Sequence, residues 1–220
     1  MVASSSNWAT QTAFHAVSPG CRMKRPSSFS MLLWVDAVGG FLVCGGDRIV
    51  VGQAVPAAGV DVPIQADLSR RHLTIHRDGG GYVAASAART RIDNKEVEGA
   101  DNLRDGSIIE MNDRVRLEFR CPHPLSATAR LNLVSHHRTQ PAVDGIILMA
   151  DTLILGPSSN CHITSRHFGS DVVLFRRGQQ WFCRTDGDFK VNGDVFRSEA
   201  PIGPGATVTG GDFSFTLENA

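Results

Sequence analysis

The eight residues Leu68–Ile75, LSRRHLTI, join a basic segment to the start of a strand. The second half of this stretch alternates apolar and polar residues, which is the two-residue period of a strand with one buried face. Just before it, Ser69, Arg70 and Arg71 place a hydroxyl and two guanidinium groups on a predicted loop. Guanidinium groups match phosphate or carboxylate oxygens and a hydroxyl adds a donor, so the loop is a candidate oxyanion site. The alternative is a solvated basic turn before a strand.

Short apolar runs continue on both sides of this stretch and are separated by Gly, Asp or Asn. They include MLLWV, FLVCGGDRIVVG, GYVAA, SIIEM and RVRLEF before residue 121, and LNLV, GIILMADTLILG, DVVLF, WFCRT and FSFTL after residue 129. None of them carries the 3.6-residue apolar stripe of a surface helix. The sequence therefore predicts an all-β chain, with β-sandwiches as the expected architecture.

The chain also contains an internal repeat. When Asp171 is aligned with His72, an offset of 171 − 72 = 99, HLTIHRDGGGYVAAS lies over DVVLFRRGQQWFCRT without a gap, and Trp181 lies over Tyr82. The segment between the copies, CPHPLSATA, carries two prolines and small polar residues, as linkers do. We expect a flexible leader at residues 1–28, a first domain at 29–121, a linker at 122–129 and a second domain at 130–220.

Composition narrows the function classes. The 22 Lys and Arg residues balance 22 Asp and Glu residues, which argues against broad electrostatic binding to nucleic acid or to an anionic membrane. The longest apolar runs, such as Gly145–Ala150, are too short to span a bilayer. Five cysteines without a CxxC pair favour a reducing compartment, and the amino terminus lacks the apolar core of a secretory signal. We therefore expect a cytoplasmic protein.

These landmarks together resemble the forkhead-associated (FHA) domain, a β-sandwich of the SMAD/FHA type whose loops read phosphothreonine in partner proteins. Gly52 matches the glycine of the family's Gly-Arg pair, and Ser69-Arg70-Arg71-His72 matches its Ser-x-x-His motif in full. The stretch Ser86–Asn94 stands where the family has its Asn-Gly motif, and Leu103–Ile109 resembles its late turn and strand. The resemblance covers nearly all of residues 31–120 and, more faintly, 130–218.

The resemblance implies roles for individual residues of the first copy. Candidate phosphopeptide-binding residues are Ser69, Arg70, Arg71 and Arg89, and candidate loop-supporting residues are Gly52, His72 and Ser86. Two family contacts are missing, because Gln53 replaces the family arginine and Ala88 replaces the asparagine that grips the peptide. Loss of a charge-assisted bond to phosphate costs about 1.5–3 kcal/mol, so the resemblance implies weak binding unless the other arginines compensate.

The second copy departs further from the family pattern. Its glycine is followed by Pro157, and Asp171 stands where the histidine belongs. A carboxylate cannot donate the same hydrogen bond and repels an anion. We therefore expect a degenerate FHA-like copy that keeps the architecture and lacks the phosphate site.

The sequence does not favour enzymatic or metal chemistry. Ser69 and His72 occur without a G-x-S-x-G elbow or a candidate orienting acid, so a hydrolase is not expected. Cys121 and His123 with His136-His137 match no structural zinc pattern, and we expect no metal and no cofactor. The sequence predicts a non-enzymatic adaptor in signalling that binds a protein partner, expected to be threonine-phosphorylated. The alternative is a phosphate-independent scaffold or self-associating β-protein; the oligomeric state stays open.

Overall fold

The structure is a computed structural model that describes residues 29–79 and 81–220. Within these ranges every regular element is a strand and none is a helix, which confirms the predicted all-β class. Over the same ranges, nothing helical is long and apolar enough to cross a membrane. The predicted leader, residues 1–28, lies outside the described residues.

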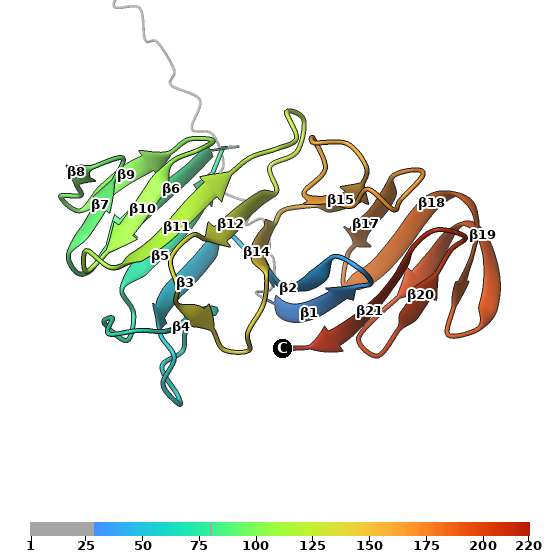
Figure 1. Cartoon of the computed structure of the whole chain (residues 1–220), viewed down its shortest axis with the longest axis horizontal. Coiled ribbons are helices and arrows are strands. Elements are labelled where there is room, and N and C mark those ends of the chain that lie inside the picture. Colours follow the sequence, from blue (N-terminus) through green and yellow to red (C-terminus); the bar gives the residue numbers. More distant parts are fainter. Residues whose placement is uncertain (1–28, 80) are drawn as a thin grey trace, which may run out of the picture.

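The strands gather in two lobes, with three strands between them (Figure 1). The first lobe holds β3 (Arg48–Gln53), β4 (Val62–Gln65), β5 (Leu73–Asp78), β6 (Gly81–Ser86), β7 (Thr90–Ile92), β8 (Lys95–Glu96), β9 (Ala100–Leu103), β10 (Ile108–Met111), β11 (Val115–Arg120), β12 (Ala129–Leu133) and β13 (Arg138–Thr139). The second lobe holds β15 (Thr152–Gly156), β16 (Ile163–Thr164), β17 (Val172–Arg177), β18 (Gln180–Val191), β19 (Asp194–Ile202), β20 (Thr207–Thr209) and β21 (Ser214–Asn219). The central strands are β1 (Phe29–Val35), β2 (Gly39–Gly45) and β14 (Gly145–Met149).

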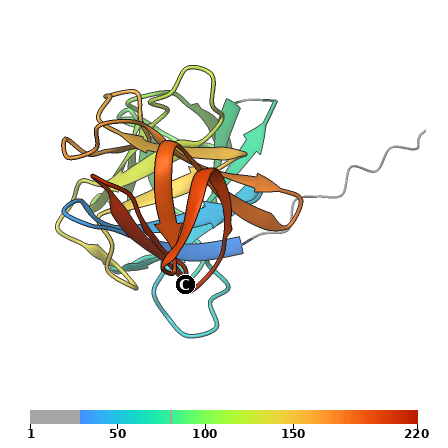
Figure 2. The ribbon, with the colours of Figure 1, turned by 90° about the vertical axis from the view of Figure 1, so that its right-hand side faces the viewer.

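Over the described residues the strands form two sheets. The larger sheet has 15 strands and passes through both lobes in the order β16-β15-β17-β18-β20-β21-β1-β2-β14-β12-β11-β10-β7-β8, with β19 paired to β18. The smaller sheet, β13-β4-β3-β5-β6-β9, covers the other side of the first lobe. The second lobe faces the viewer in Figure 2. Its long strand β18 pairs with β17, β19 and β20, and the pairing with β19 shifts register between Arg184 and Asp188. The irregularity lies where β18 changes partner, because its residues 180–184 pair with β17 whereas Lys190 and Val191 pair with β20.

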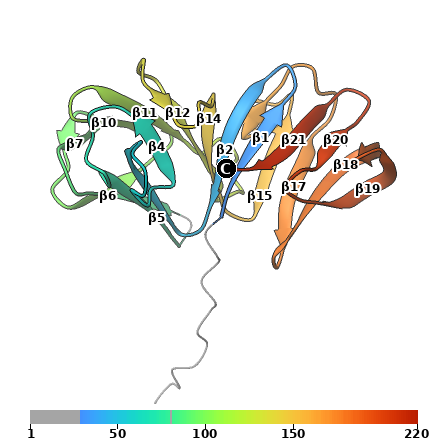
Figure 3. The same cartoon turned by 90° about the horizontal axis from the view of Figure 1, so that it is seen from below.

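The central strands separate two apolar cores, which we call the first and the second core after the lobes that contain them (Figure 3). On β2, Leu42 and Cys44 enter the first core, whereas Phe41 and Val43 enter the second. Strand β14 alternates in the same way, and all five of its residues are buried. Burial on both faces explains why these strands read as continuous apolar runs instead of alternating ones.

The pairing of the central strands shows that each lobe is completed by a hairpin from the other half of the sequence. The hairpin β1–β2 precedes the first lobe in sequence, but β1 pairs with β21 of the second lobe. Conversely, β12 and β14 precede the second lobe in sequence, but β12 pairs with β11 of the first lobe. The two hairpins meet where β2 and β14 pair in parallel, from Phe41↔Gly145 to Gly45↔Met149. We call this arrangement the hairpin exchange.

Residues that the sequence repeat aligns occupy equivalent strand positions. His72 and Asp171 each stand immediately before a strand, β5 and β17. Tyr82 and Trp181 are each the second residue of the following strand, and they pair with Arg77 and Arg176. These registers support the interpretation of two copies of one fold, although the tandem repeat and its degenerate second copy remain predictions.

Two hairpin turns repeat in the same manner. Asp93 N–H donates to Ile108 O at 3.0 Å, and Asn192 N–H donates to Thr207 O at 2.9 Å. Asp93 and Asn192 both adopt positive φ, at 50° and 53°. Asp and Asn tolerate this left-handed region better than other non-glycine residues because their side chains bond locally. The turn chemistry of the two copies is therefore alike although the residues differ.

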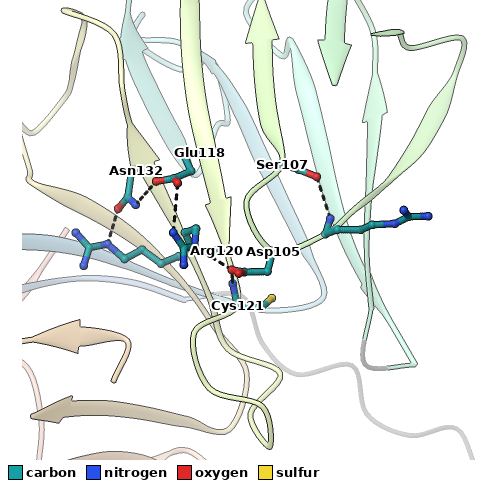
Figure 4. Close-up of polar contacts among 8 residues, drawn as sticks. Asp105, Ser107, Glu118, Arg120, Cys121 and Asn132 are labelled. Atoms are coloured by element: carbon teal, nitrogen blue, oxygen red, sulfur yellow. Dashed lines mark hydrogen bonds and ion pairs between the residues drawn. The ribbon is translucent and has the colours of Figure 1, made fainter. Parts of the chain in front are cut away.

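The segment 122–129, predicted as a linker, lies in the connection from β11 to β12 and ends on Ala129, the first residue of β12; these two strands pair with each other. Its first end is anchored, since Asp105 Oδ1 accepts hydrogen bonds from Arg120 Nε at 2.9 Å and from Cys121 N at 2.8 Å (Figure 4). The two cores meet along β2 and β14. The domain bounds stay a prediction, and the segment itself lies between neighbouring strands of one sheet.

Candidate functional site

The candidate loop lies between β4 and β5, at one end of the smaller sheet. Leu68 is buried in the first core and fixes the loop to the lobe. The next three residues, Ser69, Arg70 and Arg71, are exposed, and the fourth, His72, is fully buried. Leu68 and His72 therefore anchor the two ends of the loop. Between them one hydroxyl and two guanidinium groups face solvent on a fixed backbone.

His72 holds the loop through both ring nitrogens. Ser69 N–H donates to Nδ1 over a long 3.4 Å contact, so Nε2 carries the proton and donates to Arg89 O at 3.1 Å. Burial lowers the pKa of His72, and the backbone bond to Arg89 opposes that shift. The ring is therefore neutral at pH 7, and it links the loop before β5 to the turn between β6 and β7.

Gly52 makes the close approach of the loop possible. A Cβ built at this position would lie 2.0 Å from the Arg70 carbonyl oxygen, which is far inside van der Waals contact. The loop is also bonded to the end of β3, because Gln53 N–H donates to Ser69 O at 3.1 Å. The predicted supporting role of Gly52 thus has a direct steric basis.

Ser86 organises the neighbouring turn. Its Oγ lies 2.5 Å from Ala88 O and 2.6 Å from Thr90 Oγ1, and Thr90 Oγ1 also donates to Ala88 O at 3.1 Å. These short-range contacts fix residues 86–90, the turn whose Arg89 carbonyl accepts the His72 bond. Ser86 and His72 therefore support the same turn from two sides.

The three candidate arginines are not equivalent. Among the described residues Arg70 and Arg71 make no ion pair, whereas Arg89 Nη1 lies 2.8 Å from Asp113 Oδ2. The same aspartate receives Arg91 Nη2 at 2.9 Å. The structure brings Ser69, Arg70 and Arg71 together on one loop and directs the Arg89 guanidinium to Asp113. The free cationic charge of the site is thus on the loop itself.

Sequence analysis missed the turn between β10 and β11 as a neighbour of the loop. Asn112 Nδ2 donates to Asp67 O at 2.9 Å, and Asn112 N–H donates to Arg89 O at 3.1 Å. Asn112 therefore contacts the loop and the turn that His72 also joins. The only local signal was the positive φ expected of the consecutive pair Asn112-Asp113, at 50° and 57° in the structure.

The corresponding place in the second lobe has opposite electrostatics. Asp171 is exposed and accepts a hydrogen bond from Cys161 Sγ at 3.4 Å. A Cβ on Gly156 would lie 2.1 Å from the Asp171 carboxylate, whereas the equivalent Gly52 faces a backbone carbonyl. Burial, and then the bond to Asp171, raise the pKa of the Cys161 thiol to about 11. The carboxylate occupies the position of the histidine and adds negative charge beside the loop.

No group of three or more His, Cys, Asp and Glu side chains among residues 29–79 and 81–220 is arranged to hold a metal ion. Cys121 and His123 lie in the segment before β12, while His136 and His137 lie in the connection after it. Ring stacking joins His136 to His137, and Ser135 Oγ lies 3.0 Å from His137 Nδ1.

No protein-family model matches this chain, and no curated protein matches it. Solved structures that resemble it are FHA domains. One comes from a structural and functional analysis of phosphothreonine-dependent FHA domain interactions; it is 24% identical with a TM-score of 0.28, and the match covers 38% of this chain and 88% of that one. The FhaA FHA domain, complexed with the intracellular domain of Rv3910, is 23% identical with a TM-score of 0.26, over 38% of this chain and 93% of that one.

The N-terminal FHA domain of EssC, a component of the bacterial type VII secretion apparatus, matches over 86% of this chain and 92% of its own. Its identity is only 9% and its TM-score 0.24. Likenesses this distant carry no argument about function.

Proposed function

We propose that this chain is a non-enzymatic protein-interaction module whose first lobe binds a phosphothreonine-containing segment of a partner protein. The observation that carries the proposal is the loop Ser69-Arg70-Arg71. It is exposed, its arginines have no ion-pair partner among the described residues, and its backbone is fixed by Gly52 and His72. A rigid loop with uncommitted guanidinium groups and a hydroxyl is suited to a phosphate dianion.

The same contacts disfavour catalysis by Ser69 and His72. Both ring nitrogens of His72 are occupied by backbone groups, so neither is free to take a proton from the Ser69 hydroxyl. His72 acts instead as a support for the loop. Binding without chemistry is the function that this geometry favours.

Affinity should be modest. Gln53 stands where a further guanidinium would face the phosphate, Ala88 has no side-chain donor, and Arg89 is held by Asp113. Each missing charge-assisted bond lowers affinity by about tenfold to a hundredfold. Micromolar or weaker binding is expected, and it should weaken further as salt rises because the site is exposed.

The test is calorimetric titration of the full chain with a degenerate phosphothreonine peptide library and with its unphosphorylated twin. Only the phosphorylated library should bind, Ser69→Ala and Arg70→Gln should reduce binding, and Gln53→Arg should increase it. Arg166→Gln, a change at an exposed arginine in the second-lobe loop, is the matched control and should have no effect. Equal binding of both libraries would refute the phosphate site and favour a phosphate-independent scaffold.

A further inference from the structure

The two exchanged hairpins differ in their connections. Strands β1 and β2 are joined by a tight turn, residues 36–38, whereas β12 and β14 are joined by residues 134–144. We call this longer connection the excursion. Nothing in the packing of β12 against β14 requires it, because the equivalent pair β1 and β2 closes without one. We therefore expect the additional residues of the excursion to serve another role.

The excursion runs beside the candidate loop of the first lobe. Its strand β13 extends the smaller sheet by pairing with β4, with Arg138 opposite Gln65 and Thr139 opposite Ile64. Gln65 Nε2 also donates to Gln140 Oε1 at 3.3 Å. Because β4 ends at Gln65 and leads directly into the loop, a segment assigned by sequence to the other domain flanks the phosphate site.

Between the excursion and the turn after β10 lies a hollow of about 400 Å³. The turn supplies Asp113 and Arg114, and the excursion supplies His136 and His137. The turn contacts the loop itself through the bond from Asn112 Nδ2 to Asp67 O at 2.9 Å. The hollow is therefore bounded by two elements that both touch the chain leading to Ser69.

Within the part of the chain that the structure describes, Arg114 is the one charged residue lining this hollow that has no ion-pair partner. Asp113 is neutralised by Arg89 and Arg91, at 2.8 and 2.9 Å, and Arg116 Nε lies 2.7 Å from Glu110. Arg114 is exposed and has no ion pair among the described residues. The imidazoles of His136 and His137 also line the hollow, and they add hydrogen-bonding groups without adding negative charge.

Hydrogen bonds between the excursion and β11 hold the edge of the hollow in place. Val134 N–H donates to Arg116 O at 3.0 Å, and Arg116 N–H donates to Ser135 Oγ at 3.2 Å. Ser135 Oγ in turn meets His137 Nδ1 at 3.0 Å. The histidines thus stand on a segment tied to β11, so the hollow is formed before any ligand arrives.

We propose that this hollow is a specificity subsite that reads acidic residues flanking the phosphothreonine of the partner segment, with Arg114 as the residue that pairs with an Asp or Glu carboxylate. The inference rests on the proposed function, because the same peptide must reach the loop Ser69-Arg70-Arg71 and the hollow beside it. The site thereby selects phosphothreonine in an acidic context.

The experiment compares three phosphothreonine peptides, each with its unphosphorylated twin, on the full chain: one with neutral flanks, one with four Asp on the amino-terminal side and one with four Asp on the carboxyl-terminal side. One acidic peptide should bind about two- to fivefold tighter than the neutral one at low salt, as expected for an exposed ion pair. Arg114→Gln should remove this preference and leave the neutral peptide unaffected. Arg104→Gln, at an exposed first-lobe arginine that likewise has no ion pair with any residue in 29–79 or 81–220, is the matched control and should preserve the preference.

The outcomes separate the two proposals. If all three phosphopeptides bind equally, or if Arg114→Gln weakens all of them alike, the subsite is refuted and the phosphate site stands. If Arg104→Gln removes the preference as Arg114→Gln does, the effect is one of overall charge and the subsite is again refuted. If no peptide binds in a phosphate-dependent manner, both proposals fall.

Discussion

Replacement of Gly52 by Ala tests the support of the phosphate loop directly. The added methyl group would lie 2.0 Å from the Arg70 carbonyl oxygen, and ordinary contact begins at 3.4 Å, so the loop must move by about 3.4 − 2.0 = 1.4 Å. Such a shift would strain or break the bond from Gln53 N–H to Ser69 O. Overpacking costs about 1–3 kcal/mol and a lost hydrogen bond about 0.5–1.5 kcal/mol, while Ala regains about 0.4–1 kcal/mol by restricting the unfolded chain.

The expected net loss is about 2 kcal/mol in the free energy of unfolding. For a chain of this size that corresponds to a fall of about 4–8 °C in the midpoint of thermal unfolding, measured by circular dichroism. Gly187→Ala is the control, because a Cβ there meets nothing within 4 Å. Gly156→Ala should cost less than Gly52→Ala, since the group in its way is the movable Asp171 side chain. If Gly52→Ala left the midpoint and phosphopeptide binding unchanged, the steric account of the loop would be wrong.

Three further predictions follow from burial. His162 is buried, and desolvation followed by the nearby His123 lowers its pKa to about 4, so the unfolded chain takes up the proton first as pH falls. The free energy of unfolding, measured with urea, should therefore fall by about 3 kcal/mol between pH 6.5 and pH 4. His162→Gln should reduce this dependence on pH, and an unaltered dependence in the variant would contradict the prediction. Trp181→Ala should cost about 3–5 kcal/mol, because the ring is buried in the second core and packs edge-on against Phe29 at 5.0 Å; an unchanged unfolding midpoint would count against that core. Burial raises the pKa of the Cys44 and Cys183 thiols to about 12, so mass spectrometry should find both unmodified by a thiol reagent at pH 8 until the chain is unfolded; rapid native labelling would show that they are accessible.

Local features of the fold were predictable from sequence because they depend on near neighbours. The two-residue period gave the strands, and the hairpins at Asp93 and Asn192 follow from residues that accept positive φ. Cys44 and Cys183 stand inside apolar runs, where a free cysteine behaves as a small hydrophobic residue, and both are buried in the structure. In each case the deciding interactions lie within one strand or one turn.

The partners of the hairpins could not be predicted in the same way. FLVCG of β2 and GIILM of β14 are both apolar on two faces, so either could cover either core. Their choice depends on contacts between strands distant in sequence, such as Leu33↔Leu217 and Val43↔Ile147, which a local pattern does not encode.

The candidate site also has one part that was predictable from sequence and one part that was not. The loop and its histidine form one continuous motif and were found from sequence, while the neighbours Asn112 and Asp113 come from a turn more than 40 residues later in the chain. For that reason the ion pair of Arg89 with Asp113 could not be predicted from the sequence. The role of Arg89 in binding phosphate stays a prediction.

The hairpin exchange means that a broken chain would stay assembled. A protease cut within residues 122–128 would yield one fragment carrying β1–β11 and another carrying β12–β21, and each fragment would carry the hairpin that completes the lobe of the other. The fragments would remain joined through β1 with β21, β11 with β12, and β2 with β14. Produced separately, the two pieces should complement each other as a split protein, so the point that looks in sequence like a border between modules is a place to cut without separating them.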